Sequence, residues 1–152
     1  MLTRPALLVL SAAILTACGG SAAPVEGLPS GALAIDTGAG EVRFQVSIAE
    51  TTEARSRGLM GVEELADDSG MVFLEPQPVQ ASFWMKDTLI PLSIAFWDED
   101  GQILAILDME PCREDPCETY GPGVPWIGAV EVNRGIFEER GVEAGDRVSL
   151  ER

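Results

Sequence analysis

Apolar and polar side chains alternate most regularly in the part of the chain that follows residue 40. Val42, Phe44, Val46 and Ile48 are each separated by one polar residue. Successive side chains of a β-strand point to opposite faces of a sheet, so this period of two is typical of a half-buried strand. The clearest strand of the fold is therefore predicted here.

Shorter apolar runs bounded by glycine, proline and acidic residues predict further strands. Residues 82–97 form the longest apolar segment outside the N-terminus. We expect two strands there, broken near Pro91, because proline has no amide proton to donate to a ladder. A tight turn at 98–101 then leads into a returning strand, and this hairpin is expected to be the heart of the sheet. The strand that begins at residue 70 is expected to end at Pro76 and Pro78. The other strands are predicted at residues 31–36, 102–108, 126–132 and 147–150.

Two short helices are predicted between the strands. Thr51 or Thr52 can cap a helix over residues 53–57. Residues 133–140 can form a second helix that is ended by a glycine. Many short strands with only two weak helices indicate a mainly β fold, either a compact antiparallel sandwich or a small barrel. A chain of 152 residues is too short for two ordinary cores, so we expect a single domain over residues 31–152.

Residues 1–17 have the pattern of a signal peptide. Arg4 supplies a positive charge, an apolar run follows at residues 6–15, and small residues close the segment. The apolar run is too short to span a bilayer. The segment is therefore predicted to direct export.

The sequence Leu15-Thr16-Ala17-Cys18 resembles the lipobox of bacterial lipoproteins. The resemblance implies that Cys18 is acylated and becomes the new N-terminus, which would make the lipid bilayer a partner and hold the domain outside the cytoplasm. Two or more acyl chains give stable anchoring. Ordinary cleavage that leaves a free cysteine, or a chance match, is the alternative. Residues 18–30, rich in small residues and proline, are predicted to be the lipidated cysteine and a flexible tether.

Charge excludes one class of partner. The chain has 10 basic and 25 acidic residues, which gives a net charge of −15. This charge repels phosphate backbones, so no nucleic-acid partner is expected. The simpler interpretation of the acidic composition is that it only keeps an exported protein soluble.

Cysteine and histidine usage narrows the chemistry further. Cys112 and Cys117 are separated by four residues, and in an exported protein such a pair indicates a disulfide, with free thiols as the alternative. The chain contains no histidine. No Ser-His-Asp or Cys-His arrangement can therefore form, and neither a metal nor another cofactor is expected.

Lys86 is the only lysine of the chain. On a single strand, Trp84, Lys86 and Thr88 would share one face and form a polar and aromatic patch, which is a candidate wall of a site. A desolvated lysine can also serve as a base or an amine nucleophile. The structural alternative is that the Lys86 stem lies on Trp84 and its ammonium group pairs with Glu110 or Glu131.

Arg57 and Tyr120 complete the candidates. Arg57, at the end of a predicted helix, can bind an anion or carboxylate, or can only cap the helix and pair at the surface. Tyr120 borders a loop rich in glycine and proline, where its ring can stack on a sugar or peptide or pack under the disulfide. The candidate ligand-binding residues are Arg57, Trp84, Lys86, Thr88, Tyr120 and Glu131.

Five motifs lie in a fixed order along the chain: Arg57–Gly61, Gly70–Phe73, Phe83–Phe96, Glu131–Gly135 and Gly145–Val148. Together they resemble the domain-of-unknown-function 192 family over roughly residues 42–150. The resemblance implies a compact, mainly β domain that is often exported and attached to a membrane, and it brings no established activity. The family pattern usually has asparagine in place of Asp87 and aspartate in place of Ser93. A carboxylate at position 87 can accept a hydrogen bond but cannot donate one.

These observations favour a membrane-anchored, non-catalytic ligand-binding or accessory module of the cell envelope, with a saccharide, a peptide or an envelope polymer as its ligand. Two other hypotheses stay open. The protein can be an enzyme that uses Lys86 as a base or amine, or an envelope protein that binds other proteins.

Overall fold

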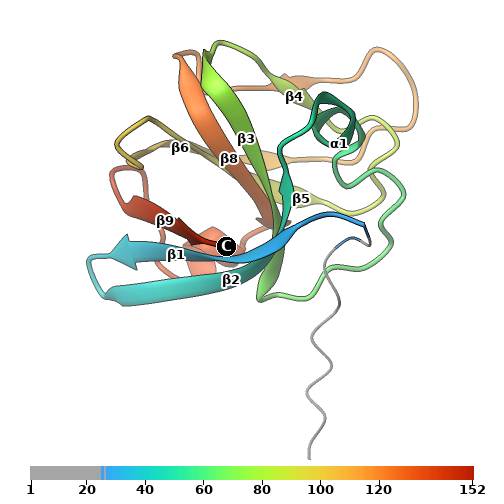
Figure 1. The fold of residues 1–152 in the computed structure, drawn as a ribbon. Coiled ribbons are helices and arrows are strands. Elements are labelled where there is room, and N and C mark those ends of the chain that lie inside the picture. Colours follow the sequence, from blue (N-terminus) through green and yellow to red (C-terminus); the bar gives the residue numbers. More distant parts are fainter. Residues whose placement is uncertain (1–24, 26) are drawn as a thin grey trace, which may run out of the picture.

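The computed structural model describes Val25 and residues 27–152, and it consists mainly of β-strands (Figure 1). Seven strands form one sheet and two short strands form another. The predicted mainly β fold with two short helices is confirmed. The elements in chain order are β1 (Ser30–Thr37), β2 (Gly40–Ala49), α1 (Thr52–Arg57), β3 (Ser69–Val79), β4 (Phe83–Trp84), β5 (Leu92–Trp97), β6 (Ile103–Met109), β7 (Thr119–Tyr120), β8 (Trp126–Asn133), α2 (Ile136–Glu139) and β9 (Arg147–Glu151).

The large sheet has the strand order β6-β5-β8-β3-β2-β1-β9. β2 and β3 are parallel, and the other neighbouring strands are antiparallel. The sheet bends until its two ends approach each other. Gln102, just before β6, forms a bridge with Arg147 of β9, and the N–H of Val148 donates to the carbonyl of Gly101 at 2.8 Å. Within residues 27–152 this bridge does not close the sheet, so the fold is sandwich-like and not a barrel.

Apolar side chains cover both faces of the bent sheet. Along β3, Val72 belongs to one cluster and Met71 and Phe73 belong to another, as the alternation of side chains in a strand requires. The first core contains the edge-to-face pair of Phe44 and Phe137, whose ring centroids are 5.9 Å apart. The second core, on the opposite face, is covered by α1, β4 and the loops near them. This second core supports the candidate site.

Most of the predicted strands are present, but three details differ. β3 is longer than expected, the strand predicted before Pro91 is reduced to the two residues of β4, and β7 was not predicted. β2 has the alternating burial that its pattern predicts between residues 42 and 46. β3 does not end at Pro76 and Pro78 but continues to Val79. Its register with β8 shifts between Leu74 and Val79, so the two prolines lie in an irregular stretch where their missing N–H groups interrupt no regular ladder.

The prediction that the β5–β6 hairpin is the heart of the sheet is wrong. β6 lies at one end of the strand order, and β3 and β8 are more central. All six residues of β5 are buried because apolar side chains cover both faces of the strand. The continuous apolar run of β5 therefore shows that both faces of the strand are covered, and it does not show that the strand is central in the sheet.

Both helices are short, and α1 is built as predicted. The Thr51 hydroxyl accepts a hydrogen bond from the N–H of Ala54 at 3.1 Å, and the helix ends at Gly58, whose φ is 49°. α2 has only four residues, because Asn133 still belongs to β8 and Gly135 begins the helix with a φ of 85°. The prediction of a helix from residue 133 was therefore too long.

The predicted signal peptide and Cys18 lie outside the described residues. The last part of the predicted tether belongs to the domain. The N–H of Val25 donates to the hydroxyl of Ser47 at 2.7 Å, the carbonyl of Pro29 accepts from Ile48 at 2.8 Å, and Ser30 begins β1. In the described part of the chain, no helix has the length and apolar character needed to cross a membrane.

Candidate functional site

Four of the six predicted ligand-binding residues line one small pocket. Arg57, Trp84, Thr88 and Glu131 lie around a space of about 30 Å³, with Ser56 at its wall. We call this space the inner pocket. It is enclosed by α1 and the loop after it, by β4, and by the face of β8 that carries the second core.

Glu131 comes from the middle of β8. It pairs with Met71 of β3 on one side and with Ile94 of β5 on the other. Alternation along β8 places Val130 and Val132 in the first core and turns Glu131 toward the opposite face. Only 4% of the residue is exposed. Burial raises the pKa of this carboxyl group from 4.5 to about 8, with no other cause, so Glu131 is mainly neutral at pH 7 and can donate a hydrogen bond.

Thr88 reaches the pocket through a turn and not along a strand. β4 ends at Trp84, and the N–H of Thr88 donates to the carbonyl of Met85 at 3.1 Å. Asp87 has a φ of 55°, so the alternation assumed for residues 82–88 stops there. Trp84 is 53% exposed and Thr88 only 5%. The prediction that Trp84, Lys86 and Thr88 share one face of a strand was therefore wrong.

The left-handed conformation also explains why position 87 tolerates the change from the usual asparagine. Asparagine and aspartate are the non-glycine residues that adopt this region most readily. Position 87 requires a residue that accepts a positive φ, which both asparagine and aspartate do. The main-chain N–H and carbonyl of Asp87 are both hydrogen-bonded. Its N–H donates to the carbonyl of Cys112 at 3.0 Å, and its carbonyl accepts from Gly61 at 3.0 Å.

Ser93, the second departure from the family pattern, is structural. Its hydroxyl donates to the carboxylate of Asp108 at 2.5 Å and accepts from the N–H of Gly135 at 3.0 Å. Asp108 lies directly opposite Ser93 in the β5–β6 register. A carboxylate of the neighbouring strand β6 thus accepts the hydrogen bond of Ser93.

Trp84 is exposed because its neighbour Phe83 anchors β4. The Phe83 ring lies 4.8 Å from that of Phe73, 5.7 Å from that of Phe96 and 5.6 Å from that of Trp126. In a strand of two residues, an inward Phe83 requires an outward Trp84. The indole is therefore held at the surface by a buried aromatic cluster.

A larger groove adjoins the inner pocket. This outer groove has a volume of about 320 Å³ and shares Trp84, Ser56 and Arg55 with the inner pocket, while Ser82 and Thr52 add two hydroxyl groups. Its lining therefore combines one exposed aromatic ring with several hydroxyl groups. Sequence reasoning did not single out Thr52 and Ser56 as site residues, because isolated hydroxyl residues carry no recognisable pattern.

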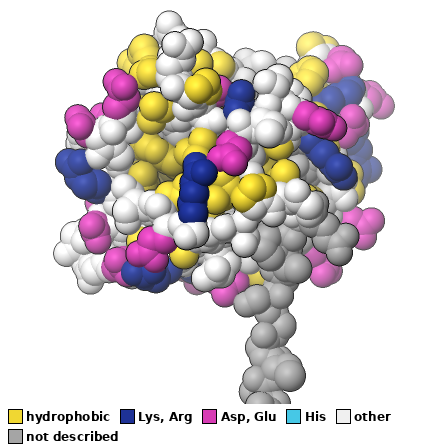
Figure 2. All heavy atoms as spheres, viewed as in Figure 1, with side chains coloured by type: hydrophobic (Ala, Val, Ile, Leu, Met, Phe, Trp, Pro, Cys, Tyr) yellow, Lys and Arg dark blue, Asp and Glu magenta, His cyan; other side chains and the backbone are white. Residues whose placement is uncertain are grey.

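Arg55, which the sequence analysis also missed, separates the outer groove from a wider one. Its guanidinium pairs with Glu75 at 3.0 Å and donates to the carbonyls of Glu50 and Leu74 at 2.7 and 3.0 Å. The wide groove, about 590 Å³, continues beyond this pair to Arg152. Figure 2 shows one face of the molecule, on which apolar side chains gather near the centre with a basic and an acidic side chain across them.

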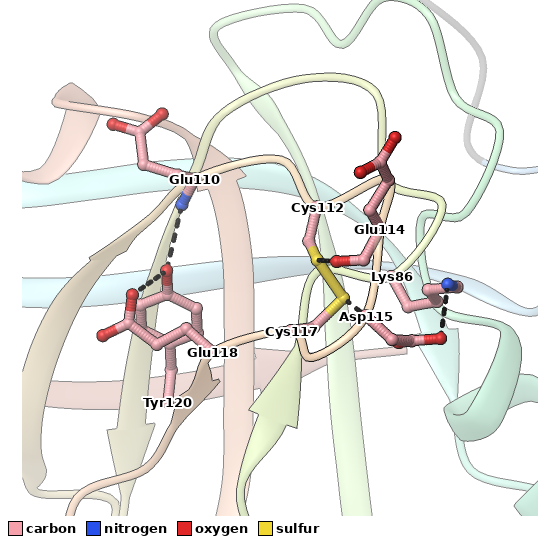
Figure 3. Close-up of a disulfide and its surroundings, with 8 residues drawn as sticks. All are labelled: Lys86, Glu110, Cys112, Glu114, Asp115, Cys117, Glu118 and Tyr120. Atoms are coloured by element: carbon pink, nitrogen blue, oxygen red, sulfur yellow. Dashed lines mark hydrogen bonds and ion pairs between the residues drawn. A yellow bond between two sulfur atoms is a disulfide. The ribbon is translucent and has the colours of Figure 1, made fainter.

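Lys86 and Tyr120 are not part of this site. The Lys86 ammonium group pairs with Asp115 at 2.9 Å, not with the predicted Glu110 or Glu131, and this hydrogen bond raises the pKa of Lys86 (Figure 3). The Tyr120 hydroxyl donates to Glu118 at 3.1 Å and accepts from the N–H of Glu110 at 3.3 Å. Both residues instead hold the loop that the Cys112–Cys117 disulfide closes.

The groups at the site can donate and accept hydrogen bonds. The inner pocket offers a neutral carboxyl group, a hydroxyl group and a guanidinium group, and the outer groove offers a ring and hydroxyls. Among the described residues, no three cysteine or acidic side chains are grouped as metal ligands would be.

Comparison with known proteins places this geometry in a family. The model of DUF192, described as "Uncharacterized ACR, COG1430", matches residues 34–150. The chain belongs to the DUF192 family. The match includes the four pocket residues at positions 57, 84, 88 and 131, so the whole site lies within the DUF192 domain.

Two solved structures are similar to this DUF192 chain. A protein of unknown function from Novosphingobium aromaticivorans is 32% identical, with a TM-score of 0.75, over 82% of this chain and 88% of that one. A putative transcription regulator from Sinorhizobium meliloti is 27% identical, with a TM-score of 0.74, over 81% of this chain and 95% of that one. A search of curated proteins finds no match.

Proposed function

We propose that this DUF192 protein is a non-catalytic binding module for saccharides of the cell envelope, anchored to a membrane as a lipoprotein. The observation that carries the proposal is the exposed Trp84 ring at a groove that leads to the inner pocket with its neutral Glu131. An aromatic face and a few directed polar groups in a concave surface are the usual elements of a small-ligand site.

The shape of the site supports a long ligand. The outer groove and the wide groove share Thr52, Arg55 and Glu75, and together they extend from Trp84 to Arg152. A linear polymer can lie along both, with one unit against Trp84. Hydroxyl groups of Ser56 and Ser82 can exchange hydrogen bonds with sugar hydroxyls, since both kinds of group donate and accept.

The alternative of an enzyme that uses Lys86 loses its physical support. A lysine base or amine nucleophile needs a lowered pKa, which burial or a neighbouring cation provides. The pKa of Lys86 is instead raised by Asp115, and the Lys86 side chain lies outside the pockets described above. Its ammonium group holds the disulfide loop.

Glycan binding tests the proposed function. The full chain, purified in a mild detergent, is applied to an array of bacterial envelope glycans, and affinities for the bound members are measured by titration calorimetry. Trp84→Ala is expected to weaken binding about tenfold, because an aromatic contact contributes about 0.5–1.5 kcal/mol beyond its buried area. Val124→Ala is the matched control, because Val124 is also a large exposed apolar residue but lies in the loop between β7 and β8. Absence of binding, or equal effects of the two substitutions, contradicts the proposal.

Metabolic labelling tests the proposed anchor. Cells that produce the full chain are fed an alkyne-tagged fatty acid, and label on the protein is compared between the wild type and Cys18→Ser. Label and membrane fractionation that both depend on Cys18 are expected. Labelling that persists in Cys18→Ser contradicts anchoring through this residue.

A further inference from the structure

The inner pocket is a locally positive place on a strongly acidic protein. The chain carries 25 acidic and 10 basic residues. In the described part of the chain, no carboxylate pairs with Arg57, whereas Arg55 pairs with Glu75. The remaining ionisable group of the pocket, Glu131, is mainly neutral at pH 7. Arg57 is exposed at the rim of the pocket, so its guanidinium group is available to bind an anion from outside the chain.

We propose that the inner pocket binds the carboxylate of an acidic saccharide, such as one that contains uronic acid, while the sugar ring lies against Trp84. This inference rests on the proposed saccharide-binding function and names the class of saccharide. It also requires a negative charge on the ligand. The net charge of the chain repels such a ligand at long range, so the attraction must come from the local charge of Arg57 in the pocket.

The size of the pocket fits a single small group. Its volume is about 30 Å³, which is room for one or a few water molecules and not for a sugar ring. A carboxylate that projects from a ring in the adjoining outer groove can enter, because both spaces share Trp84 and Ser56.

The donors of the pocket match a carboxylate. The Glu131 carboxyl group, the Thr88 hydroxyl and the Arg57 guanidinium can all donate hydrogen bonds, and a carboxylate is purely an acceptor. Glu131 and Thr88 are more than nine-tenths buried. Neither Arg55 nor Arg57 forms an ion pair with Glu131, so Glu131 does not neutralise the guanidinium group of Arg57.

The same geometry makes carboxylate binding depend on pH. The elements that face Glu131 bring Arg55 and Arg57 from α1, and only uncharged side chains from β3, β4 and the turn at Thr88. Above the pKa of about 8, the Glu131 carboxyl group loses its proton. It then repels a ligand carboxylate that it previously held by a hydrogen bond.

The first experiment compares ligands that differ only in charge. Oligosaccharides that contain glucuronate, galacturonate or mannuronate are each paired with the carboxyl-reduced form, in which the carboxylate becomes a hydroxymethyl group. Titration calorimetry with the full chain at pH 7 is expected to show binding of at least one acidic member, about tenfold tighter than its reduced form. Equal affinity for both forms, still dependent on Trp84, overturns the carboxylate subsite and leaves the saccharide function standing. Absence of binding to every member overturns both.

Two variants test the residues. Arg57→Gln is expected to reduce the preference for the acidic form from about tenfold to about one. Arg113→Gln, at an exposed arginine of the disulfide loop, is the matched control and should keep that preference.

For the wild type, affinity for the acidic form should fall about tenfold or more between pH 7 and pH 9.5, and in Glu131→Gln this fall should disappear. A preference that survives in Arg57→Gln, or the same pH profile in Glu131→Gln and wild type, overturns the inference. Circular dichroism at each pH confirms that the variants remain folded.

Discussion

Glu131 is a carboxyl group that the fold buries between two strands without a charged partner. Its pKa is about 8 in the folded protein and near 4.5 in an unfolded chain. Between these values the folded state holds a proton that the unfolded state has released. The contribution of this group to the free energy of unfolding therefore falls as pH rises from 4.5 to 8, by up to about 1.4 kcal/mol per pH unit, and is constant above.

Replacement of Glu131 by glutamine should remove the loss of stability that Glu131 causes as pH rises. Chemical denaturation at pH 5, 6.5 and 8 is expected to show that Glu131→Gln gains stability relative to the wild type as pH increases, because an amide cannot ionise. Glu64→Gln, in an exposed loop, serves as the control and should follow the wild type. Parallel pH profiles for the wild type and Glu131→Gln would mean that the carboxyl group is hydrated and not buried as described.

Asp87 carries a second prediction at the residue scale. Because its φ is 55°, a side chain that cannot bond locally is strained there. Asp87→Ala is expected to lower the free energy of unfolding by about 1 kcal/mol, and Asp87→Asn or Asp87→Gly should cost much less. Equal losses for alanine and asparagine would assign the effect to the lost carboxylate instead of the backbone.

At the residue scale the sequence identified four residues of the inner pocket, in part for a wrong reason. Trp84 and Thr88 are selected with Lys86 on the assumption of one continuous strand, and Glu131 is considered as a partner of Lys86. The turn at Asp87 breaks that strand, directs Thr88 inward and takes Lys86 to Asp115. A single residue in the left-handed region cannot be recognised from apolar and polar periodicity, because aspartate occurs in ordinary loops as well.

At the scale of elements, local patterns predicted most of the strands and helix α1, but they did not predict which strands pair with one another. β8 inserts between β3 and β5, and β2 pairs in parallel with β3. These pairings join segments far apart in the chain and depend on how the two cores pack, which no local pattern contains. The hairpin of β5 and β6 was predicted correctly as a pair and wrongly as the centre for this reason.

Gly128 tests the packing of β8 against β5. It lies opposite Trp97, and a β-carbon added there would meet the indole ring at 2.2 Å. Gly128→Ala is therefore expected to lower the free energy of unfolding by about 3 kcal/mol or more, because backbone and a buried ring must both shift. Gly38→Ala is the matched control, since nothing lies within 4 Å of its added β-carbon. Similar melting temperatures for the two variants would contradict the close contact.

At the scale of the whole molecule, the net charge of −15 acts on the folded state. Like charges in a compact structure repel one another, and salt screens this repulsion over distances near 10 Å at 0.1 M. The melting temperature is therefore expected to rise as sodium chloride increases from about 0.02 to 0.3 M. The surface ion pairs, such as Arg152 with Glu50, weaken with salt but contribute little. A melting temperature that falls with salt would show that these pairs outweigh the repulsion.

The disulfide between Cys112 and Cys117 closes a short loop, and Cys112 lies at the margin of the second core. A closed loop of this length contributes only about 2 kcal/mol, so we expect the domain to fold with two thiols in a reducing compartment and to gain the bond in an oxidising one. Alkylation of thiols in intact cells, followed by mass measurement, then shows whether the two cysteines are thiols or a disulfide, and so whether the protein has matured in a reducing or an oxidising compartment.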